Sequence, residues 1–147
     1  MLSYNSYGFF IFRKKGKNLE LLLLKASETS SLPFEYSIVK GAPEENEMPI
    51  DTCLRETYEE VKFTKSFLQI LPIPPLKYEY YVTKNEDYVI KSVTAYFSYL
   101  SIPRKPILSA EHIDYQFFTE KELQKSSIPE FLKLPYLKAF SIINQHT

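Results

Sequence analysis

Between residues 41 and 62, acidic side chains recur at a spacing that places them on one face of a helix. Glu56, Glu59 and Glu60 lie one to four residues apart, and residues three and four apart are neighbours on a helical surface. Like charges held side by side repel one another unless a cation lies among them. Carboxylate oxygens suit Mg²⁺ or Mn²⁺, which proteins bind together with a substrate phosphate. The pattern therefore predicts a divalent-cation site that binds a polyphosphate.

The opposite face of the same helix is apolar. Its residues have the spacing of a helix that lies on a core: Ile50, Cys53, Leu54, Thr57 and Val61. Pro49 suits the first turn, where a backbone N–H would have no helical partner. Cys53 is the chain's one cysteine, which excludes an internal disulfide. Its place on the apolar face indicates a buried apolar residue rather than a nucleophile.

The whole stretch reads G-x5-E-x7-R-E-x2-E-E and resembles the Nudix box, the signature of hydrolases that cleave nucleoside diphosphates linked to another moiety. The resemblance implies Mg²⁺ or Mn²⁺ as cofactor, with Glu56, Glu59 and Glu60 as metal ligands. It makes Arg55 the residue that orients a box glutamate through paired hydrogen bonds. Glu47 is then an organiser of the loop that could also reach a metal. Glutamates on a helix are more often a solvated face, but here the rest of the motif is in register.

Two further segments resemble the asymmetrical diadenosine tetraphosphate hydrolases. They are SAEHIDYQFF, at 109–118, and the opening YGFFIFR…LELLLLKAS, so the similarity runs from about residue 7 to 123. In that group a glutamate next to a histidine reaches the metal site from a loop. By that resemblance Glu111 is an extra ligand or the general base, and it joins Arg55, Glu59 and Glu60 as a catalytic residue. The alternative is an ordinary loop carboxylate, and His112 fits a substrate contact and a structural role equally.

The same resemblance implies how a substrate would be held. Adenine would stack between Tyr81 and Tyr115, and Lys40 beside Gly41 would contact a phosphate. An aromatic face gains about 1–3 kcal/mol from a stacked base. Core packing is the alternative for any tyrosine in a chain that has 12 of them. Two other lysines are discounted, because basic surface residues are usually only solvated: Lys84 and Lys91.

The chain departs from these families at four places. Tyr36 and the run IVKGA, at 38–42, stand where the group has a tryptophan and a PPKGH-like run. Ala110 replaces a histidine before the EH pair. Lys62 replaces the glycine that normally ends the box helix through a left-handed conformation, so we expect a different helix end. The metal ligands are intact, whereas the changed residues lie near the substrate.

These observations predict a metal-dependent nucleotide pyrophosphohydrolase, with asymmetrical hydrolysis of diadenosine tetraphosphate to ATP and AMP as the first hypothesis. Another Nudix substrate, either a nucleotide or a capped or triphosphorylated RNA 5′ end, is the second. A binding protein that holds adenine nucleotides without turnover is the third. It would suit the altered residues 38–42, but the intact R-E-x2-E-E argues against it.

Composition bears on the number of domains, on nucleic-acid binding and on cellular location. With 147 residues, 44% of them hydrophobic, the chain fits a single Nudix-like domain, 1–147, with the box at 41–62. The formal net charge of zero and the lack of a basic stripe argue against a nucleic-acid surface. No signal peptide or membrane span is predicted, and the one cysteine suits a reducing compartment, so we expect a cytoplasmic protein. The sequence makes no prediction of a protein partner.

The elements that must position the site follow from hydrophobic runs and turn residues. Strands are predicted at 7–13, 19–26, 34–39, 67–71, 77–83, 89–100 and 115–118. A polar loop at 27–33 and a turn at 84–87 connect some of them. Thr119 and Glu122 form a capping box for a short helix, and a last helix is expected at 135–144. Strands interleaved with helices indicate the α/β class and a mixed sheet, in agreement with the Nudix-type α/β/α sandwich.

Overall fold

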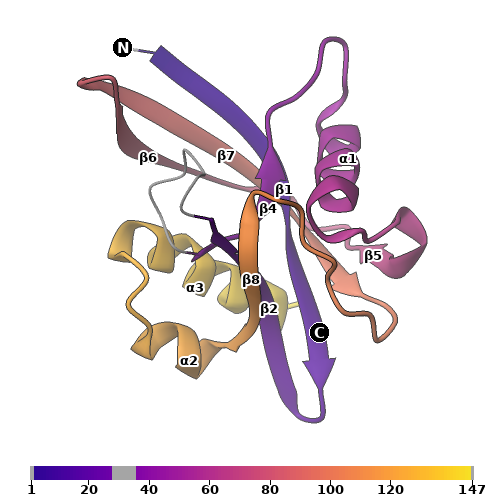
Figure 1. Ribbon diagram of the computed structural model, residues 1–147. Helices are drawn as coiled ribbons and strands as arrows, with labels where there is room; N and C mark the ends of the chain where they lie inside the picture. The colour runs from indigo at the N-terminus through magenta and orange to yellow at the C-terminus, as the bar shows by residue number, and fades with distance from the viewer. Residues whose placement is uncertain (1, 28–35, 147) are drawn as a thin grey trace.

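The computed structural model describes residues 2–27 and 36–146, and within them a mixed sheet is covered by helices on both faces (Figure 1). The α/β/α sandwich predicted from the sequence is confirmed. The strands are β1 Leu2–Lys15, β2 Asn18–Ala26, β3 Tyr36–Ser37, β4 Val39–Gly41, β5 Leu68–Ile70, β6 Leu76–Lys84, β7 Asp87–Leu100 and β8 His112–Thr119. The helices are α1 Pro49–Val61, α2 Glu120–Lys125 and α3 Glu130–Asn144, with a short 3₁₀ turn at Lys65–Phe67.

The sheet is organised around β1. This strand runs parallel to β7 over most of its length and antiparallel to β2 and β4. β8 pairs with β2, while β5 and β6 pair with β7. The predicted turn at 84–87 is a two-residue hairpin, in which Asn85 and Glu86 both have positive φ, at 53° and 70°. Such a turn matches the twist of the flanking strands.

Alternation along β1 and β2 divides the core in two. Phe9 and Ile11 face α1, together with buried residues of that helix such as Cys53. Phe10 and Phe12 face the other way, into a core shared with α2 and α3. Because successive side chains of a strand point to opposite faces, one apolar run can serve both layers. Figure 1 shows α1 on one side of the sheet and α2 with α3 on the other.

α1 ends in a way that the sequence did not predict. Lys62 itself adopts the left-handed conformation, at φ 62° and ψ 27°, and its N–H donates to the Tyr58 carbonyl at 2.9 Å. The helix therefore closes as it would with glycine, and the expectation of a different end was wrong. A non-glycine residue costs about 1–2 kcal/mol in this conformation. The Lys62 ammonium lies 4.9 Å from the Tyr58 ring centroid, a contact that offsets part of that cost.

The last helix begins earlier than expected. α3 starts at Glu130, and Pro135 lies inside it rather than at its start. Proline has no N–H to donate to the preceding turn, which is why the sequence favoured a start there. The helix continues because its apolar face is packed, with Phe140 and Ile143 buried and Leu137 partly buried as predicted. The capping box of α2 is confirmed, since Thr119 and Glu122 exchange both hydrogen bonds.

The remaining expectations differ mainly at their ends. β1, β7 and β8 are longer than predicted, and the strand expected at 34–39 is two short strands, β3 and β4, with residues 34–35 outside the described part. The loop expected at 27–33 lies outside it too, apart from Ser27. Among the described residues no helix has the length and apolar character needed to span a bilayer.

Candidate active site

α1 can lie close to the sheet because of a glycine beneath it. The Cys53 thiol donates to the Gly8 carbonyl, with Sγ 3.3 Å from the oxygen. A Cβ at Gly8 would overlap the Val39 carbonyl and Lys40 of the neighbouring strand β4. β1, β4 and α1 therefore meet at a spacing that a larger residue would prevent. Burial raises the pKa of the Cys53 thiol to about 12, which keeps it protonated and unreactive, as predicted for a core residue.

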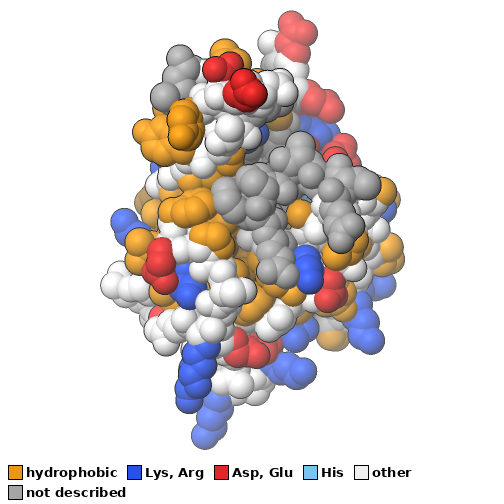
Figure 2. All heavy atoms as spheres, turned by 60° about the vertical axis from the view of Figure 1, so that its left-hand side comes forward, with side chains coloured by type: hydrophobic (Ala, Val, Ile, Leu, Met, Phe, Trp, Pro, Cys, Tyr) orange, Lys and Arg blue, Asp and Glu red, His pale blue; other side chains and the backbone are white. Residues whose placement is uncertain are grey.

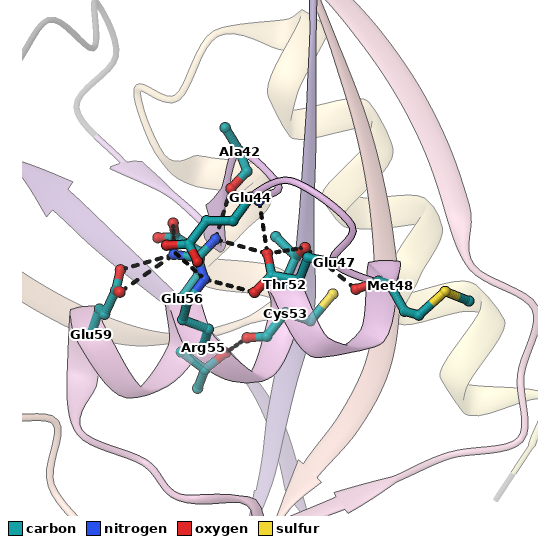
Figure 3. Close-up of polar contacts among 10 residues, drawn as sticks. Ala42, Glu44, Glu47, Met48, Thr52, Cys53, Arg55, Glu56 and Glu59 are labelled. Atoms are coloured by element: carbon teal, nitrogen blue, oxygen red, sulfur yellow. Dashed lines mark hydrogen bonds and ion pairs between the residues drawn. The ribbon is translucent and has the colours of Figure 1, made fainter.

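Arg55 and Glu47 form a two-point ion pair at the start of the site (Figure 3). Arg55 Nε donates to Glu47 Oε2 at 2.8 Å and Nη2 donates to Oε1 at 3.0 Å. Glu47 also accepts from the Thr52 hydroxyl at 2.7 Å and from the Glu44 backbone N–H at 3.0 Å. These bonds lower the pKa of Glu47 from 4.5 to about 2, with Arg55 the main cause. Glu47 thus ties the loop before α1 to the helix.

The remaining donors of Arg55 reach two other acids of the box. Nη1 donates to Glu56 Oε1 at 3.0 Å and to Glu59 at 3.3 Å, while Nη2 donates to the Ala42 carbonyl at 2.8 Å. Figure 3 shows the guanidinium between the loop and these carboxylates. The pKa of the Arg55 guanidinium is raised above its usual value, mainly because of its hydrogen bonds to Glu47. Arg55 is therefore a fixed cation that holds several side chains of α1 in place.

Gly41 provides the space in which Glu56 lies. A Cβ at this position would overlap the Glu56 carboxyl group, so any other residue would displace it. Gly41 ends β4, which pairs with β1 through the partners Tyr7 and Gly41. Gly41, the glycine of the box, is thus required because it leaves room for the Glu56 carboxylate.

Glu60 is buried, although it belongs to the acidic helix face that also carries the exposed Glu59. Its side chain is 5% exposed, against 53% for Glu59. Glu60 Oε1 lies 3.9 Å from His112 Nε2, and Oε2 has no hydrogen-bond partner among the described residues. Burial, followed by the hydrogen bond and charge of Glu56, raises the pKa of Glu60 well above 4.5. A proton or a cation must therefore balance this carboxylate pair.

The segment before β8 covers Glu60 and brings Glu111 to the helix. The Ile107 N–H donates to the Val61 carbonyl at 3.0 Å, and the Ser109 N–H donates to the Glu60 carbonyl at 3.2 Å. The Glu111 carbonyl accepts from the Ser27 N–H at 2.9 Å. These bonds fix the segment to the C-terminal end of α1 and to β2. Glu111 and Glu60 therefore lie close together, although about a third of the chain's length separates them in the sequence.

These side chains line one hollow of about 950 Å³, which we call the acidic hollow. The predicted residues among its lining are Lys40, Gly41, Glu56, Glu59, Glu60, Glu111 and His112. Burial lowers the pKa of Lys40, while the charges of Glu60 and Glu56 oppose that shift. The pKa of His112 is also lowered, mainly by burial. Both groups can donate to an anion that enters beside the carboxylates.

The two tyrosines predicted to stack adenine are not among the described residues that line the acidic hollow. Tyr81 is exposed on β6, and Tyr115 on β8 packs edge-on against Phe117. Tyr4 lines the hollow instead, with the Lys91 ammonium 4.7 Å from its ring centroid. Sequence reasoning discounted Lys91 and did not consider Tyr4. The parallel pairing of Tyr4 with Lys91 joins β1 to β7, and only the fold reveals it.

The donor set of the acidic hollow fits a hard divalent cation. Glu56, Glu59, Glu60 and Glu111 supply carboxylate oxygens, the ligands that Mg²⁺ and Mn²⁺ prefer. The buried, unpartnered oxygen of Glu60 is an atom that such an ion would satisfy. Within residues 2–27 and 36–146, no three acidic, histidine or cysteine side chains are already gathered as a metal cage. Two of the four carboxylates, Glu56 and Glu59, form ion pairs with Arg55.

Comparisons with known proteins agree with this arrangement. The family model for the NUDIX domain matches residues 4–138. The chain is similar to the crystal structure of an Ap4A hydrolase binary complex from C. elegans, with 26% identity, a TM-score of 0.80, and coverage of 98% of this chain and 99% of that one. It also shares its fold with the NUDIX domain of Shewanella oneidensis NrtR complexed with ADP ribose, at 15% identity and a TM-score of 0.70, covering 100% and 90%. A search of curated proteins finds no match.

Proposed function

The chain belongs to the Nudix family, and on that premise we propose that it hydrolyses diadenosine tetraphosphate asymmetrically, to ATP and AMP, with the help of a divalent cation. The observation that carries the proposal is the convergence of the box carboxylates, Glu111 and Lys40 on one hollow. The similarity to the C. elegans Ap4A hydrolase over nearly the full length of both chains supports the choice of substrate. Residues 1–147 are proposed to act as one domain.

Glu56, Glu59, Glu60 and Glu111 are proposed as the residues that hold Mg²⁺ or Mn²⁺. When bound, such an ion lowers the pKa of water and neutralises charge on phosphoryl oxygens. Glu56 and Glu60 suit this role because they are close together and Glu60 is buried. Arg55 does not touch substrate in this proposal. It keeps Glu56 and Glu59 on the hollow's side of α1 and ties them to the Glu47 loop.

The remaining side chains would bind and orient the polyphosphate. Lys40 and Lys91 line the acidic hollow and bring positive charge to an otherwise acidic surface. His112, with its pKa lowered, is a neutral donor near the carboxylates at physiological pH. Glu111 is the proposed acceptor of the proton lost by the attacking water, because it lines the hollow from outside the helix that carries the other acids. Tyr4 offers the hollow an aromatic surface for a base.

A second candidate is a Nudix hydrolase of another nucleotide or of an RNA 5′ end. The positions of Tyr81 and Tyr115 favour it, since the expected adenine clamp does not line the hollow. Two of the residues that depart from the family run at 38–42, Ile38 and Ala42, line the hollow. The shared fold with a NUDIX domain complexed with ADP ribose supports this candidate.

Product analysis tests the proposal. Purified protein is incubated with diadenosine tetraphosphate, with Mg²⁺ or with EDTA, and nucleotides are separated by chromatography. Equal amounts of ATP and AMP are expected with Mg²⁺ only, and none from Glu60→Gln. Glu79→Gln, an exposed acid on β6, is the matched control and should retain activity. Two ADP per substrate would contradict the asymmetrical cleavage, and turnover of capped RNA or ADP ribose alone would favour the second candidate.

A further inference from the structure

A second hollow, which we call the basic hollow, lies at the far end of β1 from the carboxylates. Its volume is about 470 Å³, and it is lined by Arg13, Lys14 and Lys15 of β1 and by residues 100–105, which begin with the last residue of β7. The parallel pairing of β1 with β7 brings these two segments together, although they are far apart in the sequence. Figure 2 shows several lysine and arginine side chains protruding from the lower end of the molecule, where Figure 1 places the β1–β2 hairpin.

The two hollows are separate sites. Ser6 on β1 lines the acidic hollow, and Arg13 lines the basic one. At about 3.3 Å per residue, the separation of seven positions corresponds to roughly 20 Å along the strand. A ligand of the basic hollow is therefore not a ligand of the carboxylates.

The basic hollow carries unbalanced positive charge. Five of its lining side chains are cationic, and no acidic side chain among the described residues lines it. Of the five, Arg13 alone has a carboxylate partner in the described part of the chain, Glu20, with Nε 2.7 Å from Oε1. Four positive charges therefore surround a concave surface whose remaining lining is largely apolar, and such a surface concentrates anions.

The segment that supplies Arg104 and Lys105 is anchored at both ends. The Ser101 N–H and hydroxyl both donate to the Phe67 carbonyl, each at 2.8 Å. Beyond the two cations, the Ile107 N–H donates to the Val61 carbonyl. Pro103 and Pro106 flank the pair and restrict its backbone. The backbone that carries the two cations is thus fixed beside β1, which reduces the entropy lost when a ligand binds.

Three of the cations lie over aromatic rings. The Arg13 guanidinium is 3.6 Å from the Phe117 centroid, Lys14 Nζ is 5.2 Å from that of Tyr99, and the Arg104 guanidinium is 4.8 Å from that of Phe67. None of these three rings is among the described residues that line the basic hollow. The hollow therefore presents charge without a stacking surface, in contrast to sites for single-stranded nucleic acid.

From this combination we propose that the basic hollow is a binding site for a short chain of linked phosphates, recognised through charge and without a base. A volume of about 470 Å³ is in the usual range of small-molecule sites, about 300–1,000 Å³, and suits a compact anion better than a long strand. Binding here involves no bond breaking and needs neither a divalent cation nor the carboxylates of α1. The site is independent of the proposed hydrolysis.

Calorimetric titration of the full chain with inorganic tripolyphosphate, in EDTA, tests the proposal. One bound tripolyphosphate per chain is expected. The double variant Lys15→Ser/Lys105→Ser should weaken binding roughly tenfold, because each exposed cation contributes a modest share. Lys121→Ser/Lys125→Ser changes the net charge equally on α2 and is the matched control, expected to bind like the parent. Lys15→Arg/Lys105→Arg should also bind like the parent, which separates lost charge from damaged structure.

Several results would overturn the proposal. The first is that tripolyphosphate does not bind the parent in EDTA. The second is that tripolyphosphate binding depends on Mg²⁺ and persists in Lys15→Ser/Lys105→Ser. The third is that Lys121→Ser/Lys125→Ser loses as much affinity as Lys15→Ser/Lys105→Ser. A fourth is tighter binding of oligothymidylate than of tripolyphosphate at the same site, with more counterions released, which would assign the hollow to a nucleic-acid strand. Circular dichroism of each variant establishes that the fold is unchanged before affinities are compared.

Discussion

The guanidinium of Arg55 spans both carboxylate oxygens of Glu47, with Nε 2.8 Å from Oε2 and Nη2 3.0 Å from Oε1. This pair joins the loop that follows β4 to the second turn of α1. The same guanidinium contacts Glu56 and Glu59, so the loop and the acids of the helix are positioned by one side chain. A lysine could not replace it, because a single ammonium has no planar fork to span a carboxylate.

Glu47→Gln should change how stability depends on pH. The folded-state pKa of Glu47 is about 2, below its usual 4.5. A depressed carboxyl pKa stabilises the folded state fully above 4.5, and this contribution is lost as pH falls from 4.5 toward 2. The melting temperature of the variant should therefore be lower than the parent's near pH 7, and the two should converge near pH 2.

The control for this experiment is Glu45→Gln, an exposed acid in the same loop. Its melting curve should follow that of the parent at every pH. A Glu47→Gln variant that stays equally below the parent from pH 7 to pH 2 would mean that shape, and not charge, makes the contribution.

Gly41→Ala should reduce activity more than stability. The added Cβ overlaps the Glu56 carboxyl group, which is the far end of a flexible side chain and can swing away. Displacing one of the proposed ligands by about 1 Å can lower kcat roughly 100-fold. Steady-state kinetics and thermal melting of the same preparation measure both effects.

Gly16→Ala is the matched comparison, because it should reduce stability and leave activity unchanged. Gly16 lies in the β1–β2 turn at φ 61°, with open space around it, so alanine strains the backbone without touching the site. A destabilisation of about 1 kcal/mol with unchanged kcat is expected. If Gly41→Ala instead behaved like Gly16→Ala, the position of Glu56 would not matter to the reaction.

Tyr4→Leu should raise KM for adenine dinucleotides. Tyr4 lines the acidic hollow, and loss of one base–aromatic contact corresponds to roughly 5- to 150-fold in affinity. Tyr81→Leu and Tyr115→Leu are the comparison, since neither residue lines the hollow among the described residues, and both should leave KM unchanged. A higher KM for Tyr115→Leu with none for Tyr4→Leu would restore the clamp expected from the sequence.

The box helix could be predicted because its signals are local. Spacings of three and four residues placed Cys53 and Val61 on the core, and both are fully buried. The positions of Tyr4 and Lys91 depend instead on parallel pairing of β1 with β7, which joins residues far apart in the chain. A pattern over a few neighbouring residues cannot predict which residues of β1 and β7 pair. The same limit explains why Arg13 and Arg104 were not predicted to line one hollow.

Glu60 shows why a helical pattern alone misassigns exposure. The acids of α1 were predicted to share one face of the helix, and on that face Glu59 is half exposed. Glu60 is one residue further round, where the segment 107–112 covers it through the Ser109 N–H. A helix pattern describes which residues are neighbours, but a segment distant in sequence decides which of them is buried.

Glu60→Gln should abolish activity and raise stability, whereas Glu59→Gln should leave stability nearly unchanged. The Glu60 carboxylate is buried, lies against Glu56, and has an unpartnered oxygen. Removing its charge with a side chain of the same shape relieves about 1–3 kcal/mol, which corresponds to at least about 3 °C in melting temperature. Glu59 is half exposed, and its contact with Arg55 across one helical turn contributes only about 0.3–0.5 kcal/mol.

Melting curves with and without Mg²⁺ complete this test. A ligand that binds the folded state stabilises it, so Mg²⁺ should raise the melting temperature of the parent and do so far less for Glu60→Gln. One cause would then explain why Glu60→Gln gains stability but loses activity. The carboxylates of Glu56 and Glu60 destabilise the free protein, and a bound cation relieves their repulsion. A lower melting temperature for Glu60→Gln in EDTA would mean that the carboxylate holds the fold through His112, and the proposed role in binding the cation would fail with it.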